Sequence, residues 1–68
     1  MDKNVILSLK GNFEVEYRKA DDSVVKRVFK TEGVEQRKTD NERLITVLDV
    51  ETLEFRSLDL DRLIDVRF

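Results

Sequence analysis

The chain has 68 residues with a formal net charge of −2, and 40% of its residues are hydrophobic while 41% are charged. A chain of this length forms one domain with a small core, so we expect a single domain over residues 1–68. The sequence contains no cysteine and no histidine, which excludes disulfides, cysteine-based zinc sites and the usual catalytic nucleophile and general base. It also lacks a signal-peptide pattern and an apolar run of the roughly 20 residues that span a bilayer, so we expect a cytoplasmic protein.

Residues 1–11 fit either of two structures. Val5, Ile6 and Leu9 form a helical stripe, whereas alternate apolar positions in the same stretch fit one face of a strand. Asp2 is a suitable N-cap and the closing glycine suits the end of a helix, but that glycine also suits a turn between two strands. We favour the short helix.

Two strands follow. From Phe13 to Arg18, apolar residues alternate with charged ones, and Tyr17 shares the apolar face. Asp21–Ser23 supplies turn chemistry, because these short side chains bond to their own backbone. The second strand, Val24–Lys30, has apolar groups on both faces, which predicts a place inside the sheet.

The middle of the chain is less regular. Gly33 indicates a bulge or bend, after which pairing resumes more weakly over Val34–Lys38, and Thr39–Glu42 marks a turn. Leu44–Asp49 is predicted to be a buried strand. A helix over Glu35–Val50 is the alternative, but consecutive β-branched residues favour the strand.

The last third contains two more predicted strands. Val50–Leu53 forms a tight connection, Glu54–Leu60 a strand, Asp61–Leu63 one helical turn, and Ile64–Phe68 the last strand. Together these elements predict a mainly β protein, a small SH3-like barrel of about five antiparallel strands.

The order of these segments resembles the WYL domain across about residues 5–66. Tyr17 matches the tyrosine of its first extended segment and Arg27 the arginine of its next strand. Asp49 matches the acidic end of its third segment. The closing motif is matched by four residues, Arg56, Leu58, Arg62 and Leu63.

This resemblance has departures. Arg43-Leu44-Ile45 replaces the W-Y-L triplet, Lys30 stands where a proline is usual, and Leu58 replaces a phenylalanine. The resemblance implies a divergent, stand-alone ligand-sensing or nucleic-acid-sensing regulatory module, of the kind found among small accessory proteins of bacteria and their phages. It also implies that the tyrosine and the arginines line the sensing surface.

Arg56 and Arg62 lie among apolar residues, and a guanidinium in such a place must be paired or face a cleft. One interpretation pairs them internally with Asp49, Asp59 or Glu54. The other has Arg27, Arg56 and Arg62 converge on an anion, with Tyr17 as a stacking ring or as a core residue whose hydroxyl reaches the rim.

Three hypotheses of function follow. The first is a non-enzymatic regulatory module, monomer or homodimer, that binds a larger protein partner through a strand edge or a charged face. The second is a nucleic-acid or nucleotide binder that uses the partner-binding candidates Tyr17, Arg27, Arg56 and Arg62. The third, an enzyme, requires a metal at Asp59, Asp61 and Asp65, but that spacing favours solvated or arginine-paired carboxylates. We therefore expect no catalytic residues, no cofactor and no metal.

Overall fold

The computed structural model describes residues 3–37 and 42–67, and the fold in these residues is mainly β. One short helix precedes five strands, and a single turn of 3-10 helix precedes the last of them. The elements are α1 (Lys3–Leu7), β1 (Asn12–Arg18), β2 (Val24–Lys30), β3 (Leu44–Asp49), β4 (Glu54–Asp59), η1 (Leu60–Arg62) and β5 (Leu63–Arg67).

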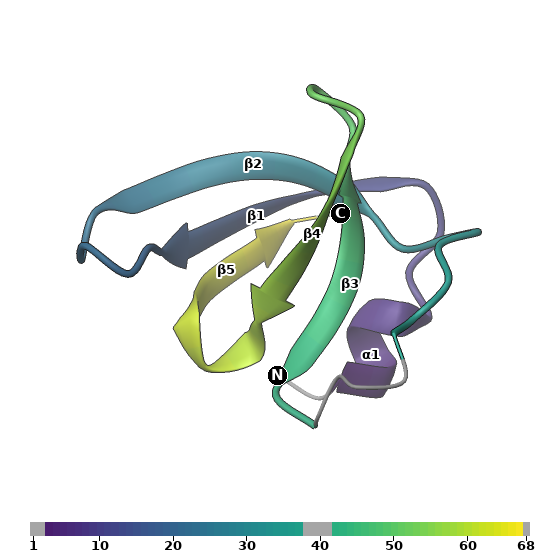
Figure 1. Ribbon diagram of the computed structural model, residues 1–68, viewed down its shortest axis with the longest axis horizontal. Helices are drawn as coiled ribbons and strands as arrows, with labels where there is room; N and C mark the ends of the chain where they lie inside the picture. The colour runs from purple at the N-terminus through teal and green to yellow at the C-terminus, as the bar shows by residue number, and fades with distance from the viewer. Residues whose placement is uncertain (1–2, 38–41, 68) are drawn as a thin grey trace.

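The five strands form one antiparallel sheet in the order β4-β3-β2-β1-β5. Strands β1 to β4 pair in sequence, β1 with β2, β2 with β3 and β3 with β4, and β5 returns to pair with β1. The sheet curls strongly, and the β1–β2 hairpin extends away from α1 (Figure 1). The predicted mainly β fold of about five antiparallel strands, with an N-terminal helix and a helical turn before the last strand, is confirmed. None of the helices in the described residues has the length and apolarity needed to cross a membrane.

Several predicted boundaries are corrected. The fourth strand ends at Asp59, because the Asp59 carboxylate accepts a hydrogen bond from the Asp61 N–H and begins η1 one residue earlier than expected. Residues 34–37 form no strand, so the prediction of resumed pairing there is wrong, and Lys38 lies outside the described residues. The predicted N-cap Asp2 and most of the predicted turn at 39–42 also lie outside them.

The core lies on the inner face of the curled sheet. Phe13 and Val15 are buried and Tyr17 is half-buried, which confirms the predicted apolar face of β1. The helix contributes Ile6, which is fully buried, and its carbonyl accepts a hydrogen bond from the Thr31 hydroxyl at 3.1 Å. The other buried apolar residues are Phe29, Ile45, Val47, Leu58 and Leu60.

Strands β2 and β3 pair over only two residue pairs, Phe29 with Asp49 and Lys30 with Leu48. Beyond this point the backbone of β3 has a different neighbour. The Gln36 side-chain amide donates to the Thr46 carbonyl and accepts from the Thr46 N–H, both at 2.8 Å. One side chain thus makes the two hydrogen bonds that a neighbouring strand would make, which explains why the segment around Gln36 packs on β3 without joining the sheet.

Candidate functional site

A groove of about 520 Å³ lies between the turn end of the β1–β2 hairpin and the segment formed by β4 and η1. The β1–β2 connection is held by short bonds, since the Lys19 N–H donates to the Ser23 carbonyl at 2.8 Å and the Asp22 N–H to the Lys19 carbonyl at 3.0 Å. One wall of the groove is therefore a rigid turn. The lining consists of Tyr17, Arg18, Lys19, Ala20, Phe29, Arg56, Ser57, Leu58, Asp59 and Arg62.

Positive charge dominates this lining. The lining contains four basic residues and one carboxylate, Asp59. The basic residues are Arg18, Lys19, Arg56 and Arg62. The apolar part of the lining includes buried side chains from β2 and β4 and the Tyr17 ring, which packs on Phe29 with its centroid 6.1 Å away. Cations around an apolar floor suit a ligand that carries both negative charge and apolar groups.

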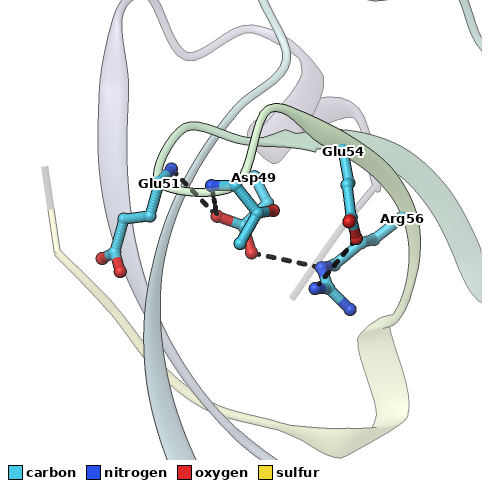
Figure 2. A network of polar contacts seen from close by, with 5 residues as sticks. Asp49, Glu51, Glu54 and Arg56 are labelled. Carbon is cyan, nitrogen blue, oxygen red and sulfur yellow. Dashed lines mark hydrogen bonds and ion pairs between the residues drawn. The ribbon is translucent and has the colours of Figure 1, made fainter.

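Arg56 is held in the groove wall by two carboxylates (Figure 2). Its Nε donates to Oδ2 of Asp49 at 3.1 Å, and its Nη2 donates to Oε2 of Glu54 at 3.4 Å. Asp49 has no exposed surface, and its Oδ1 accepts the N–H groups of Glu51 and Thr52 at 3.0 and 3.3 Å. Burial opposes ionisation of Asp49, but these backbone bonds and Arg56 outweigh it and lower the pKa of the carboxyl.

Arg62 joins the two walls of the groove. Its Nη1 donates to the Lys19 carbonyl at 3.2 Å, and its Nε lies 3.8 Å from Oδ2 of Asp59. Asp59 also lies 3.7 Å from Nε of Arg43. Because the Arg62 side chain remains 45% exposed, its remaining N–H groups are open to a ligand in the groove.

The structure brings together three of the four candidate residues. Tyr17, Arg56 and Arg62 line one groove, but Arg27 does not belong to its lining. Arg27 is half-buried on β2 opposite Val15, in the middle of the hairpin. The two interpretations of the arginines are compatible, since Arg56 and Arg62 pair with the expected carboxylates and also line the groove.

Sequence reasoning missed Arg18 and Lys19. Their signal was a pair of basic residues at the end of the first strand, one residue before the Asp21–Ser23 turn, because a hairpin end projects such residues from the sheet. The acidic residues of the metal hypothesis lie beside arginines. Asp59 lies near Arg43 and Arg62, and Asp65 lies 3.0 Å from Arg67. Within the described residues, no group of three or more acidic side chains is placed to hold a metal ion.

Comparison with protein-family models, with curated proteins and with solved structures found no match to this chain. The class that the fold and the groove define is therefore a small, mainly β protein with a basic groove at one end of its curled sheet.

Proposed function

We propose that this chain is a non-enzymatic interaction module that binds an acidic segment of a larger protein in the basic groove and so modulates that protein. The single observation that carries the proposal is the excess of cations over carboxylates around an apolar floor. An extended peptide that alternates acidic and apolar side chains would place its carboxylates on the arginines and its apolar groups on the floor.

The arrangement of the sheet supports an SH3-like barrel as the scaffold. The strand order, with β5 beside β1 and a 3-10 turn before β5, agrees with such a barrel. The resemblance to the WYL domain supports a regulatory role for the same surface, since Tyr17, Arg56 and Arg62 are residues that it assigns to sensing.

The ion pairs within the site favour specific recognition of an acidic segment, because they fix the position of an arginine before the segment binds. Arg56 is held by Asp49 and Glu54, so its guanidinium is ordered before a ligand arrives and little side-chain entropy is lost on binding. Arg18 and Lys19 are exposed, and they supply the long-range attraction that speeds encounter with an acidic partner.

The test is a fluorescence anisotropy titration with a labelled decapeptide of alternating glutamate and leucine. The unchanged chain should bind, and the double substitution Arg18→Glu and Lys19→Glu should weaken binding at least tenfold. The control carries Lys10→Glu and Lys26→Glu, which make the same change in net charge at exposed positions away from the groove. Equal weakening by both double substitutions would refute a groove-specific site.

A nucleotide or single-stranded nucleic acid is the second candidate ligand. The observation that favours it is the Tyr17 ring beside Arg18 and Arg56, since a base stacks on an aromatic ring while phosphates meet arginines. In the same assay a labelled oligothymidylate should then bind with steep salt dependence and lose affinity on Tyr17→Leu. The net charge of −2 and the burial of Phe29, the other aromatic residue of the lining, make the acidic peptide the better supported ligand.

A further inference from the structure

The edge strand β4 and the turn before it carry the two most exposed large apolar side chains among the described residues. Leu53 is 75% exposed and Phe55 is 62% exposed, whereas the other exposed apolar side chains lie between 47% and 49%. Within the described chain β4 pairs only with β3, so its other side is an open edge. An open edge beside exposed apolar residues is a template for pairing with another strand.

The β3–β4 register shows which backbone groups face this open edge. The Leu60 N–H bonds to the Arg43 carbonyl at 2.7 Å, which extends the β3–β4 register by one pair. In an antiparallel ladder the bonded pairs alternate. Ile45–Leu58 and Val47–Arg56 are therefore bonded pairs, and the backbone N–H and C=O groups of Phe55 and Ser57 face outward.

We infer that β4 pairs with β4 of a second copy of this chain about a two-fold axis at Phe55. In that register, Glu54 of each copy lies opposite Arg56 of the other, so unlike charges meet twice. The two Phe55 rings meet at the axis. Cross-strand pairs of both kinds stabilise antiparallel sheets.

The competing registers lack this complementarity. Residues whose backbone N–H and C=O groups face the open edge must lie opposite one another in the joined sheet. A two-fold axis between two residues would break this rule, so the axis must pass through a residue of β4. An axis at Arg56 would place two guanidinium groups directly opposite each other, and an axis at Ser57 would place Arg56 opposite Leu58. The charge pattern of Glu54 and Arg56 therefore selects the axis at Phe55.

The inferred dimer goes beyond the proposed function, and the apolar residues that drive it lie outside the groove. Neither Leu53 nor Phe55 lines the groove, so a chain that binds no acidic peptide would still dimerise. Because Arg56 and Ser57 do line it, pairing at β4 would place the two grooves on either side of the axis, as neighbouring sites on one face of the joined sheet. A partner with two acidic segments would then gain affinity through bivalent binding.

Sedimentation equilibrium of the full chain tests the association. The edge overlap is short and buries less than the roughly 1,200 Å² of a stable interface, so we expect a monomer–dimer equilibrium that depends on concentration. Phe55→Lys places two ammonium groups at the axis and should abolish the dimer. The control Ile64→Lys changes an exposed apolar residue of β5 and should leave it unchanged.

Engineered cysteines test the register, since the chain has none of its own. Residues opposite each other in a bonded pair have Cα atoms about 5.5 Å apart, within disulfide range. Phe55→Cys should cross-link to a dimer under mild oxidation. Ser57→Cys should stay monomeric, because the two thiols would lie about four residues apart along the strands, roughly 13 Å. A monomer up to millimolar concentration, a dimer lost on Ile64→Lys, or equal cross-linking of both cysteine variants would overturn the inference.

Discussion

The Nε atom of Arg56 lies 3.1 Å from Oδ2 of Asp49, and this carboxylate has no exposed surface. The pair joins β3 to β4 at the point where the chain turns through residues 50–53. Asp49 also accepts two backbone N–H groups of that turn, so one side chain closes the hairpin and orders the arginine that lines the groove. The Asp49–Arg56 ion pair thus stabilises the β3–β4 hairpin and also positions a residue of the candidate site.

The first prediction concerns this pair. Arg56→Ala leaves the buried Asp49 carboxylate without its charged partner, and we expect the Tm to fall by about 10 °C. The measurement is thermal unfolding followed by circular dichroism at pH 7. Arg67→Ala is the matched control, because its partner Asp65 is half exposed and an exposed pair contributes little. Equal effects of the two substitutions would contradict the role given to Arg56.

The second prediction concerns pH. The pKa of Asp49 is lowered in the folded state, as is that of Asp21, whose carboxylate accepts hydrogen bonds from the Ser23 hydroxyl and backbone. A lowered folded-state pKa means that the contribution is present above the unfolded value of about 3.9 and is lost as pH falls through the folded value. Stability in urea should therefore drop below about pH 4. Asp49→Asn should flatten that drop, and an unchanged profile in this variant would count against the assignment.

The third prediction concerns Gln36. Gln36→Ala removes both hydrogen bonds to the backbone of Thr46, a residue only 2% exposed, and should cost about 1–3 kcal/mol. Urea unfolding measures the loss, and hydrogen exchange of the Thr46 amide should accelerate. The neighbouring exposed residue supplies the control, since Glu35→Ala should change stability by less than about 0.5 kcal/mol. Slow Thr46 exchange in Gln36→Ala would show that another group protects this amide.

The fourth prediction concerns the β3–β4 turn, where Leu53 has a φ of 60°. This left-handed conformation is unfavourable for a branched side chain, so Leu53→Gly should stabilise the monomer by about 1 kcal/mol despite the loss of an apolar side chain that is already exposed. Urea unfolding at low micromolar concentration keeps dimerisation out of the measurement. A destabilised variant would show that Leu53 makes packing contacts that outweigh its backbone strain.

Much of the fold was predictable because its signals are local. Alternation along β1, the turn at Asp21–Ser23 and the β-branched run in β3 each depend on a few neighbouring residues. The segment at 34–37 was wrongly predicted as a strand, since its hydrogen bonds to β3 come from the Gln36 side chain. No local pattern distinguishes that arrangement from a short strand.

The site was predictable only in part, because the groove depends on how the sheet curls. Arg56 and Arg62 were predicted as site residues because a guanidinium among apolar residues must be paired or face a cleft. Tyr17 was predicted from the family resemblance. Arg27 was expected beside them, but the β1–β2 register places it opposite Val15 and outside the groove lining. Lys19 lines the groove because the fold brings it next to Arg62, whose side chain donates a hydrogen bond to the Lys19 carbonyl. These two residues are 43 positions apart, so no local pattern predicts their contact.

We propose that the groove between the β1–β2 turn and β4 is the binding surface. The decisive experiment is titration of the isotope-labelled chain with the glutamate–leucine decapeptide, followed by amide chemical shifts. We expect the largest shifts at Lys19, Ser57 and Arg62, which line the groove. Shifts confined to the exposed outer face of β2 around Lys26, or an unchanged spectrum at millimolar peptide, would contradict it.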